Sequence, residues 1–231
     1  EKMSHIWQDL RTGNWLTPAR IRNYALLVLA ISVAGLIGLL ATSEHLIDRN
    51  GKPIGTDFSN VYAAGVLTLS GKAPDAYDPK FQHAAEIAVF EGRDVPFFGW
   101  HYPPFFLMIA ALLALMPYAL ALLCWLAVSL PAFMAVVHAI VPRRETWLVT
   151  AAFPAVFVNI GHGQNAFFTA ALLGGYLTLL NRRPVGAGVL LGLLSYKPQF
   201  GLLIPLVLLV TGRWTTILSA ALTITVLIGA S

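Results

Sequence analysis

Long apolar runs separated by short polar breaks dominate this chain. The first run extends from Tyr24 to Ala41 and contains no charged residue. At 1.5 Å per residue it would form a helix of about 27 Å, close to the thickness of the hydrocarbon core of a bilayer. Further apolar runs cover residues 103–116, 118–141, 147–160, 166–180, 185–195 and 200–211. The pattern predicts an all-α polytopic membrane protein.

The composition agrees with this prediction. Hydrophobic residues make up 57% of the chain and charged residues only 11%, whereas about a quarter of the residues in a soluble domain are charged. The basic residues lie at the ends of the apolar runs, so we expect no nucleic-acid partner. The single cysteine, Cys124, lies inside an apolar run and permits no internal disulfide.

Basic breaks alternate along the chain with breaks that contain no arginine. The breaks at 143–144, 181–183 and 212–214 contain arginine, whereas those at 161–165 and 195–199 do not. The positive-inside rule places the arginine breaks in the cytoplasm and the other two on the outer side. Arg20 and Arg22 before the first run place the N-terminus in the cytoplasm in the same way.

This topology requires the region 103–141 to cross the membrane once, although Pro117 divides it into two apolar runs. We predict that residues 103–116 form a tilted or partly inserted helix and that 118–141 is the crossing. Two complete crossings would reverse the membrane orientation of every later segment. The adjacent Pro103 and Pro104 are typical of irregular backbone at the rim of a cavity.

The segment 43–101 is the one long polar stretch and is predicted to face outward. It holds eight of the 11 acidic residues. We predict two short amphipathic helices in it, at about 58–70 and 79–91, the second with Asp78 as N-cap. Loops of this length usually have a function, so we interpret it as an extracytoplasmic subdomain of a single membrane domain, 1–231. Because an apolar run continues to the end of the sequence, we expect the chain to be the N-terminal part of a longer protein.

Asp57 is the first residue that we single out. It precedes a set of apolar residues at helical spacing, Phe58, Val61, Tyr62, Val66 and Leu69. The helix would lie on the membrane surface or on neighbouring helices and hold the carboxylate at the water–lipid boundary. The alternative is that Asp57 is only the N-cap of this helix.

Lys197 lies between two apolar runs, where a charge is costly unless it is paired or faces a polar cavity. It could hold a lipid phosphate, or its stem could simply extend toward the outer headgroups. In the break at 161–165, Gln164 and Asn165 could bind sugar hydroxyls, and His162 could bind phosphate or carry a proton. The alternative for these three is ordinary helix capping.

Weaker signals lie elsewhere. His101 and Tyr102 precede the two prolines and are weaker site candidates. Gly188 and Gly192 have the spacing of close helix packing. We interpret Trp100, Trp147 and Trp214 as residues of the aromatic belt at the membrane interface.

Four elements now stand in order: Asp57 in the first outer loop, Tyr102-Pro103-Pro104, Gly163-Gln164-Asn165 and Lys197-Pro198. Together with the basic breaks, this order resembles glycosyltransferase family 87, the polyprenol-phosphate-mannose-dependent mannosyltransferases of the GT-C fold. The resemblance extends from about residue 20 onward. Each motif is weak alone, and their order and spacing carry the likeness.

The resemblance implies a GT-C-like helix bundle in the cell (inner) membrane whose active site faces the outside or periplasm. It implies transfer of a sugar, mannose or another hexose, from a polyprenyl-phosphate donor to a lipid or glycan acceptor. The acidic residue of the family's first outer loop is taken as the catalytic base, which corresponds to Asp57. Gln164 and Lys197 correspond to positions that line the outward cavity.

The residues fit this chemistry. An aspartate can accept the proton of an attacking hydroxyl, and a fixed cation such as Lys197 can stabilise the departing phosphate. One carboxylate suffices for an inverting transfer. We expect no cofactor and no metal, because Asp57 has no carboxylate partner at metal-ligand spacing. The alternatives are a transporter or flippase with Asp57 and Lys197 along its path, or a non-catalytic assembly subunit.

Overall fold

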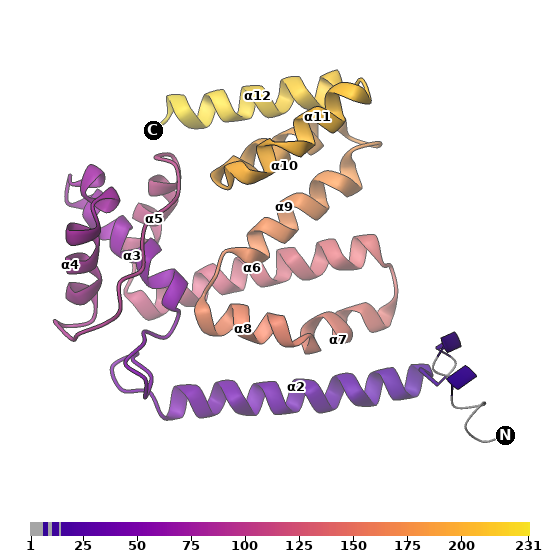
Figure 1. The fold of residues 1–231 in the computed structure, drawn as a ribbon, viewed down its shortest axis with the longest axis horizontal. Coiled ribbons are helices and arrows are strands. Elements are labelled where there is room, and N and C mark those ends of the chain that lie inside the picture. Colours follow the sequence, from indigo (N-terminus) through magenta and orange to yellow (C-terminus); the bar gives the residue numbers. More distant parts are fainter. Residues whose placement is uncertain (1–6, 9–10, 14) are drawn as a thin grey trace.

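The protein is all-α, as predicted. The computed structural model describes residues 7–8, 11–13 and 15–231, and no β-strand occurs among them (Figure 1). The helices, with η for 3-10 helices, are α2 Pro18–Ala41, α3 Thr56–Leu69, η1 Ala73–Tyr77, α4 Pro79–Val89, α5 Phe106–Ala114, α6 Tyr118–Ile140, α7 Arg144–Ala152, α8 Pro154–His162, α9 Ala166–Leu179, α10 Pro184–Leu193, η2 Leu194–Tyr196, η3 Pro198–Gly201, α11 Leu203–Val210 and α12 Trp214–Gly229.

Two helices among the described residues are long and apolar enough to cross a membrane. They are α2, with 24 residues, and α6, with 23 residues. By contrast, α5 has nine residues, which gives a helix of about 14 Å, half the thickness of a hydrocarbon core. The division at Pro117 into a short helix and one of spanning length therefore agrees with the sequence-based expectation.

The predicted span 147–160 is not one continuous helix. Residues 144–162 form two helices, α7 and α8, which meet at Phe153 and Pro154. Phe153 has an extended conformation (φ −64°, ψ 124°) and serves as the N-cap of α8. Proline has no N–H and disfavours helical backbone in the residue before it, so a new helix begins at Pro154.

The long helices pack in succession across the molecule. In Figure 1 α2 lies at one side, followed by α7 and α8, then α6, α9, α10 and α12. The connections α6–α7, α9–α10 and α11–α12 lie at the same end as the start of α2. Arg143, Arg183 and Arg213 are the N-cap residues after these connections. All basic breaks therefore share one end of the bundle, which we call the basic end.

The opposite end, which we call the site end, carries the α8–α9 connection, the α10–α11 connection and the helices α3, α4 and α5 (Figure 1). Helix α3 buries Phe58, Val61 and Ala64 in a core that also contains Phe106 and Ala110 of α5. Of the two predicted locations for this helix, the structure therefore supports packing on neighbouring helices.

Details of the first loop agree in part with the sequence-based expectations. Asp78 is the N-cap of α4, as predicted, and its side chain accepts a hydrogen bond from the backbone N–H of Lys80. Trp100 is not a belt residue, because its side chain is buried and its ring packs against Tyr102 and Phe106. Trp147 and Trp214 are exposed, as a belt residue must be.

Gly188 and Gly192 provide the close helix packing that their spacing predicts. A Cβ atom on Gly188 would lie 2.5 Å from the Thr216 carbonyl oxygen, and one on Gly192 would lie 2.5 Å from Thr223 Cβ. Both neighbours belong to α12. The absence of side chains on one face of α10 therefore lets the two helices approach closely.

Candidate active site

Asp57 lies in the first turn of α3, two residues after the N-cap, which is Gly55. The alternative that Asp57 is only the N-cap is therefore wrong. Its carboxylate is half-buried and has no hydrogen-bond or ion-pair partner within the described ranges. The positive end of the helix dipole favours a charged carboxylate at this position. Asp57 is thus available to a ligand.

The break at 161–165 lies directly beside Asp57. Thr56 Oγ1 and His162 Nδ1 are 2.5 Å apart, and the backbone N–H of Gly55 donates to the Gly161 carbonyl (3.0 Å). A cavity of about 150 Å³ is lined by Asp57, Ala155, Val158, Asn159, His162 and Gln164. The structure therefore brings three predicted site residues into one small cavity, which we call the Asp57 cavity.

Gly163 makes this approach possible. It ends α8 in the left-handed conformation (φ 60°), which favours glycine. A Cβ atom there would lie 2.7 Å from Phe58 Cβ and 2.8 Å from Leu122 Cδ1. The indole N–H of Trp125 also donates to the Gly163 carbonyl at 3.0 Å. A larger residue would push the 161–165 break away from α3.

Asn165 and Tyr102 form a second part of the site. Asn165 occupies the N-cap position of α9 but makes no capping hydrogen bond with its side chain. Instead its Nδ2 donates to the Tyr102 hydroxyl at 2.7 Å. Burial raises the pKa of Tyr102, the hydrogen bond from Asn165 acts in the opposite direction, and the Asp57 charge raises it further. Tyr102 is therefore neutral and within electrostatic range of Asp57.

Lys197 lies between η2 and η3 at the same end of the bundle. Its ammonium is 6.0 Å from the centre of the Tyr196 ring, and its side chain is half-buried. Burial lowers the pKa of Lys197, while the Asp57 carboxylate acts in the opposite direction. The two residues are 140 positions apart in the sequence, counted from their numbers, yet they interact electrostatically in the fold.

Ser195 is a residue that the sequence analysis did not single out. Its hydroxyl is buried and has no hydrogen-bond partner among the residues that the structure describes. With Lys197 it lines a cavity of about 240 Å³ between α10, α11 and α12 whose other side chains are apolar. We call this the Lys197 cavity. Ser195 lies two residues before Lys197 in the same break, and this position is the signal that could have identified it.

His101 does not join these residues. Its ring is exposed, and Nδ1 lies 2.7 Å from the carbonyl oxygen of Gly99, within its own segment. The structure thus gathers the other predicted residues, Asp57, Tyr102, His162, Gln164, Asn165 and Lys197, at the site end and leaves His101 outside their contacts.

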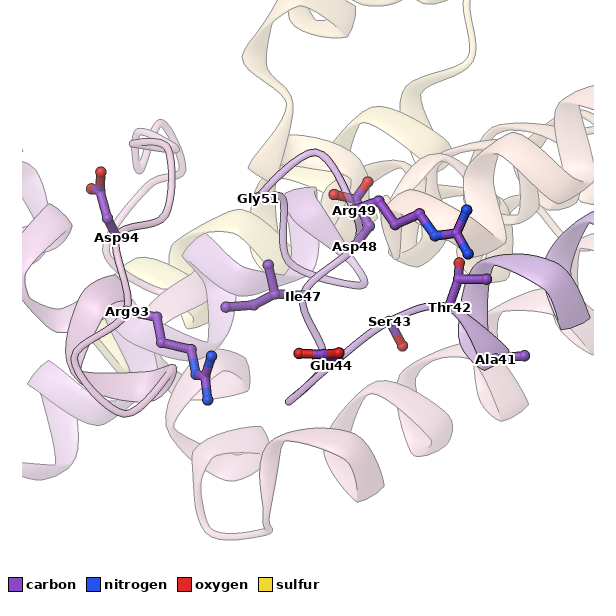
Figure 2. A pocket seen from close by; sticks show the side chains of 10 residues that line it. All are labelled: Ala41, Thr42, Ser43, Glu44, Ile47, Asp48, Arg49, Gly51, Arg93 and Asp94. Atoms are coloured by element: carbon purple, nitrogen blue, oxygen red, sulfur yellow. The ribbon is translucent and has the colours of Figure 1, made fainter.

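A larger cavity, of about 670 Å³, lies where the chain leaves α2. Figure 2 shows its side chains on two segments: one follows α2 and includes Glu44 and Arg49, and the other carries Arg93 and Asp94. His45 Nδ1 on the first segment lies 3.2 Å from a carboxylate oxygen of Glu91, just before the second segment. None of the predicted site residues lines this cavity, so volume alone does not identify the site.

Comparisons with known proteins identify one family. The family model described as glycosyltransferase family 87 matches residues 100–231, more than half of the chain. The matched part contains every predicted site residue except Asp57. No curated protein and no solved structure matches the chain.

Proposed function

The chain belongs to glycosyltransferase family 87, and from this premise we propose that it transfers a hexose such as mannose from a polyprenyl phosphate to an acceptor hydroxyl. The observation that carries the proposal is the meeting of Asp57, His162 and Gln164 in one cavity, within electrostatic range of Lys197. A proton acceptor, sugar-binding groups and a cation for phosphate are thus present together.

Asp57 is the general base in this proposal. The acceptor hydroxyl gives its proton to the Asp57 carboxylate while its oxygen forms a bond to the anomeric carbon of the sugar. The bond between that carbon and the phosphate oxygen breaks at the same time, so the configuration inverts. Since Asp57 has no partner in the described part of the chain, its oxygens are free to accept this proton.

Lys197 and Ser195 receive the leaving phosphate. Negative charge grows on the phosphate as the bond breaks, and a fixed ammonium stabilises that charge most strongly in the transition state. The unpartnered Ser195 hydroxyl supplies a second hydrogen-bond donor in the Lys197 cavity. The apolar side chains of that cavity suit the first part of the polyprenyl chain.

The sugar and the acceptor meet at the Asp57 cavity. Gln164 and His162 are exposed there and can bind sugar hydroxyls. A mostly apolar groove of about 470 Å³ between α2 and α8 also contains His162. It provides an approach to Asp57 for a lipid or glycan acceptor from the side of α2.

The proposal includes a location and an orientation. We propose a multi-pass protein of the cell (inner) membrane in a GT-C-like bundle, with the basic end in the cytoplasm and the site end facing the outside or periplasm. The positive-inside rule and the gathering of all arginine breaks at one end support it. The chemistry above uses only side chains of this protein and needs no cofactor.

Transfer by the purified protein tests this function. We expect labelled sugar to leave a polyprenyl-phosphate mannose donor for an acceptor in a membrane-lipid extract, in detergent and without any gradient. Asp57→Asn should keep folding and membrane insertion but lower turnover by about 10²- to 10⁴-fold, the usual contribution of a general base.

Asp94→Asn is the matched control, because Asp94 is an exposed acid of the same loop. It should transfer sugar like the wild type. Wild-type rates in the Asp57→Asn variant would remove Asp57 from the chemistry, and a wild-type protein that transfers nothing from this donor would refute the proposed donor.

A further inference from the structure

The segment 93–102 connects α4 to the active site and has no regular secondary structure. Side chains of η1 and α4 bond to its backbone at three points. His83 Nε2 lies 2.8 Å from the Val95 carbonyl oxygen, and the Tyr77 hydroxyl donates to the Tyr102 carbonyl at 3.0 Å. Between them, the backbone N–H of Phe98 donates to both carboxylate oxygens of Glu86, at 3.2 and 3.1 Å. The middle contact is the unusual one.

Glu86 is a fully buried acid of α4 (0% exposed) without a basic partner in the described ranges. Burial raises the pKa of Glu86 to about 7, and the hydrogen bond from Phe98 acts in the opposite direction. The titratable groups near it are the Tyr118 hydroxyl of α6 and, on α4 itself, His83. An apolar residue of similar size would avoid the cost of burying this carboxylate.

The far end of the segment belongs to the active site. The Trp100 ring packs against the Tyr102 ring with 5.0 Å between their centres. The Tyr102 hydroxyl in turn accepts the hydrogen bond from Asn165, 2.7 Å away. Tyr102 is the last residue of the segment 93–102, so its place next to Asn165 is linked to how that segment is held against η1 and α4.

We propose that Glu86 is a positioning residue: through Phe98 it fixes the segment 93–102 and so holds Tyr102 against Asn165 in the active site. The proposal rests on the function proposed above for that site. A buried acceptor of two hydrogen bonds from one N–H restrains the backbone in the middle of a segment that lacks regular structure. This gives a buried acceptor at position 86 a role, although no cation compensates its charge in the described ranges.

Protonation of Glu86 should then control this anchor. Because the pKa in the folded protein, about 7, lies above the ordinary 4.5, the folded state keeps a proton that the unfolded state releases between these values. The contribution of Glu86 to stability is therefore fully present below pH 4.5 and is lost as the pH rises through 7. Above pH 7 the buried charge favours release of the segment.

Hydrogen exchange of the whole protein in nanodiscs, without substrate, tests the anchor. After correction for intrinsic rates, we expect peptides covering 93–104 to exchange about tenfold faster in Glu86→Ala than in the wild type at pH 6, because the acceptor for Phe98 is gone. Glu86→Gln keeps an acceptor without the charge, so its exchange should stay slow at both pH 6 and pH 8. The wild type should exchange faster at pH 8.

Asp94→Asn, an exposed acid of the same segment, should follow the wild type at both pH values. Turnover should follow exchange. The kcat of Glu86→Ala should be about tenfold lower than that of the wild type. Between pH 6 and pH 8, the kcat of Glu86→Gln should not fall relative to that of the wild type. Unchanged exchange in Glu86→Ala, or the wild-type pH dependence in Glu86→Gln, would overturn the proposal.

Glu86→Gln carries the test if Glu86→Ala does not fold. The exchange result needs no sugar transfer, so the two proposals fail separately. A wild-type protein that transfers no sugar refutes the proposed function alone. A protein that transfers sugar but shows wild-type exchange in both Glu86 variants refutes the positioning role alone.

Discussion

The basic end and the site end of the bundle share the long helices and differ in how exposed their polar groups are. At the basic end the connections are short, and Arg143, Arg144 and Arg183 are exposed. At the site end Asn165 is 3% exposed and Thr56 is 6% exposed, and each makes a side-chain hydrogen bond to another site residue.

Burying polar groups is costly unless they are hydrogen-bonded. A buried and bonded set of polar side chains, such as the one at the site end, is therefore typical of a functional site. Exposed arginines, by contrast, can set the orientation of a membrane protein by charge alone. Under the proposed function the two ends therefore have different tasks, orientation at one and chemistry at the other. The following experiments test this division, beginning with the largest expected effect.

Labelling from outside the cell can separate the two ends completely. In a Cys124→Ala background, an impermeant thiol reagent should label Gln199→Cys in intact cells and Glu145→Cys only after lysis. Position 199 is exposed at the site end and position 145 is exposed in α7 at the basic end. Labelling of 145 but not 199 in intact cells would show that the topology is the reverse of the proposed one. Labelling of both would contradict the proposal that the two ends lie on opposite sides of the membrane.

Removing one cation from each end sharpens the comparison. Lys197→Met keeps most of the apolar stem but removes the ammonium that interacts electrostatically with Asp57. A hydrogen bond between charged groups contributes roughly 1.5–3 kcal/mol, so turnover should fall about 10- to 150-fold. Arg144→Met, the matched change at the basic end, should leave kcat and KM unchanged.

The kinetic constants report how Lys197 acts. If its contact strengthens as the phosphate leaves, kcat falls together with kcat/KM. Lys197→Arg should restore part of the rate, because the charge returns with a different geometry. Donor titrations of Lys197→Met that coincide with those of the wild type would exclude a phosphate contact.

The elements of this fold were predictable from the sequence where apolar runs are long and unbroken. The predicted 118–141 and 166–180 agree closely with α6 and α9. The run 147–160 is divided into two helices because it contains Pro154, where a new helix begins. Trp100 was misplaced because the sequence shows its position next to an apolar run but not the rings of Tyr102 and Phe106 that bury it.

The site could be predicted as a set of breaks but not as an assembly. Polar residues between apolar runs identified Gln164 and Lys197, yet nothing local shows that Thr56 contacts His162, 106 positions later. Glu86 and Ser195 were missed for another reason. In the described part of the chain, Glu86 is buried without a cation and the Ser195 hydroxyl is buried without a hydrogen-bond partner. Both are properties of the packed structure. A single polar residue in a sequence is otherwise ordinary.

The smallest expected effect concerns two buried serines. The hydroxyls of Ser195 and Ser129 are both buried without a partner in the described part of the chain, but only Ser195 lines the Lys197 cavity. Ser129 belongs to α6. A neutral hydroxyl contributes about 0.5–1.5 kcal/mol to a hydrogen bond, so Ser195→Ala should weaken binding of farnesyl phosphate roughly 2- to 12-fold.

Two controls assign that loss to the phosphate. Ser129→Ala removes the other buried serine hydroxyl that has no partner in the described part of the chain, and it should bind farnesyl phosphate like the wild type. Farnesol has the same chain without the phosphate, so Ser195→Ala should leave its binding unchanged. Equal losses for both ligands would place Ser195 against the chain instead of the phosphate, and equal losses for both serines would reduce the effect to packing. Only a loss confined to Ser195 and to the phosphate ligand supports a second donor beside Lys197, and with it the assignment of the leaving-group site to this end of the bundle.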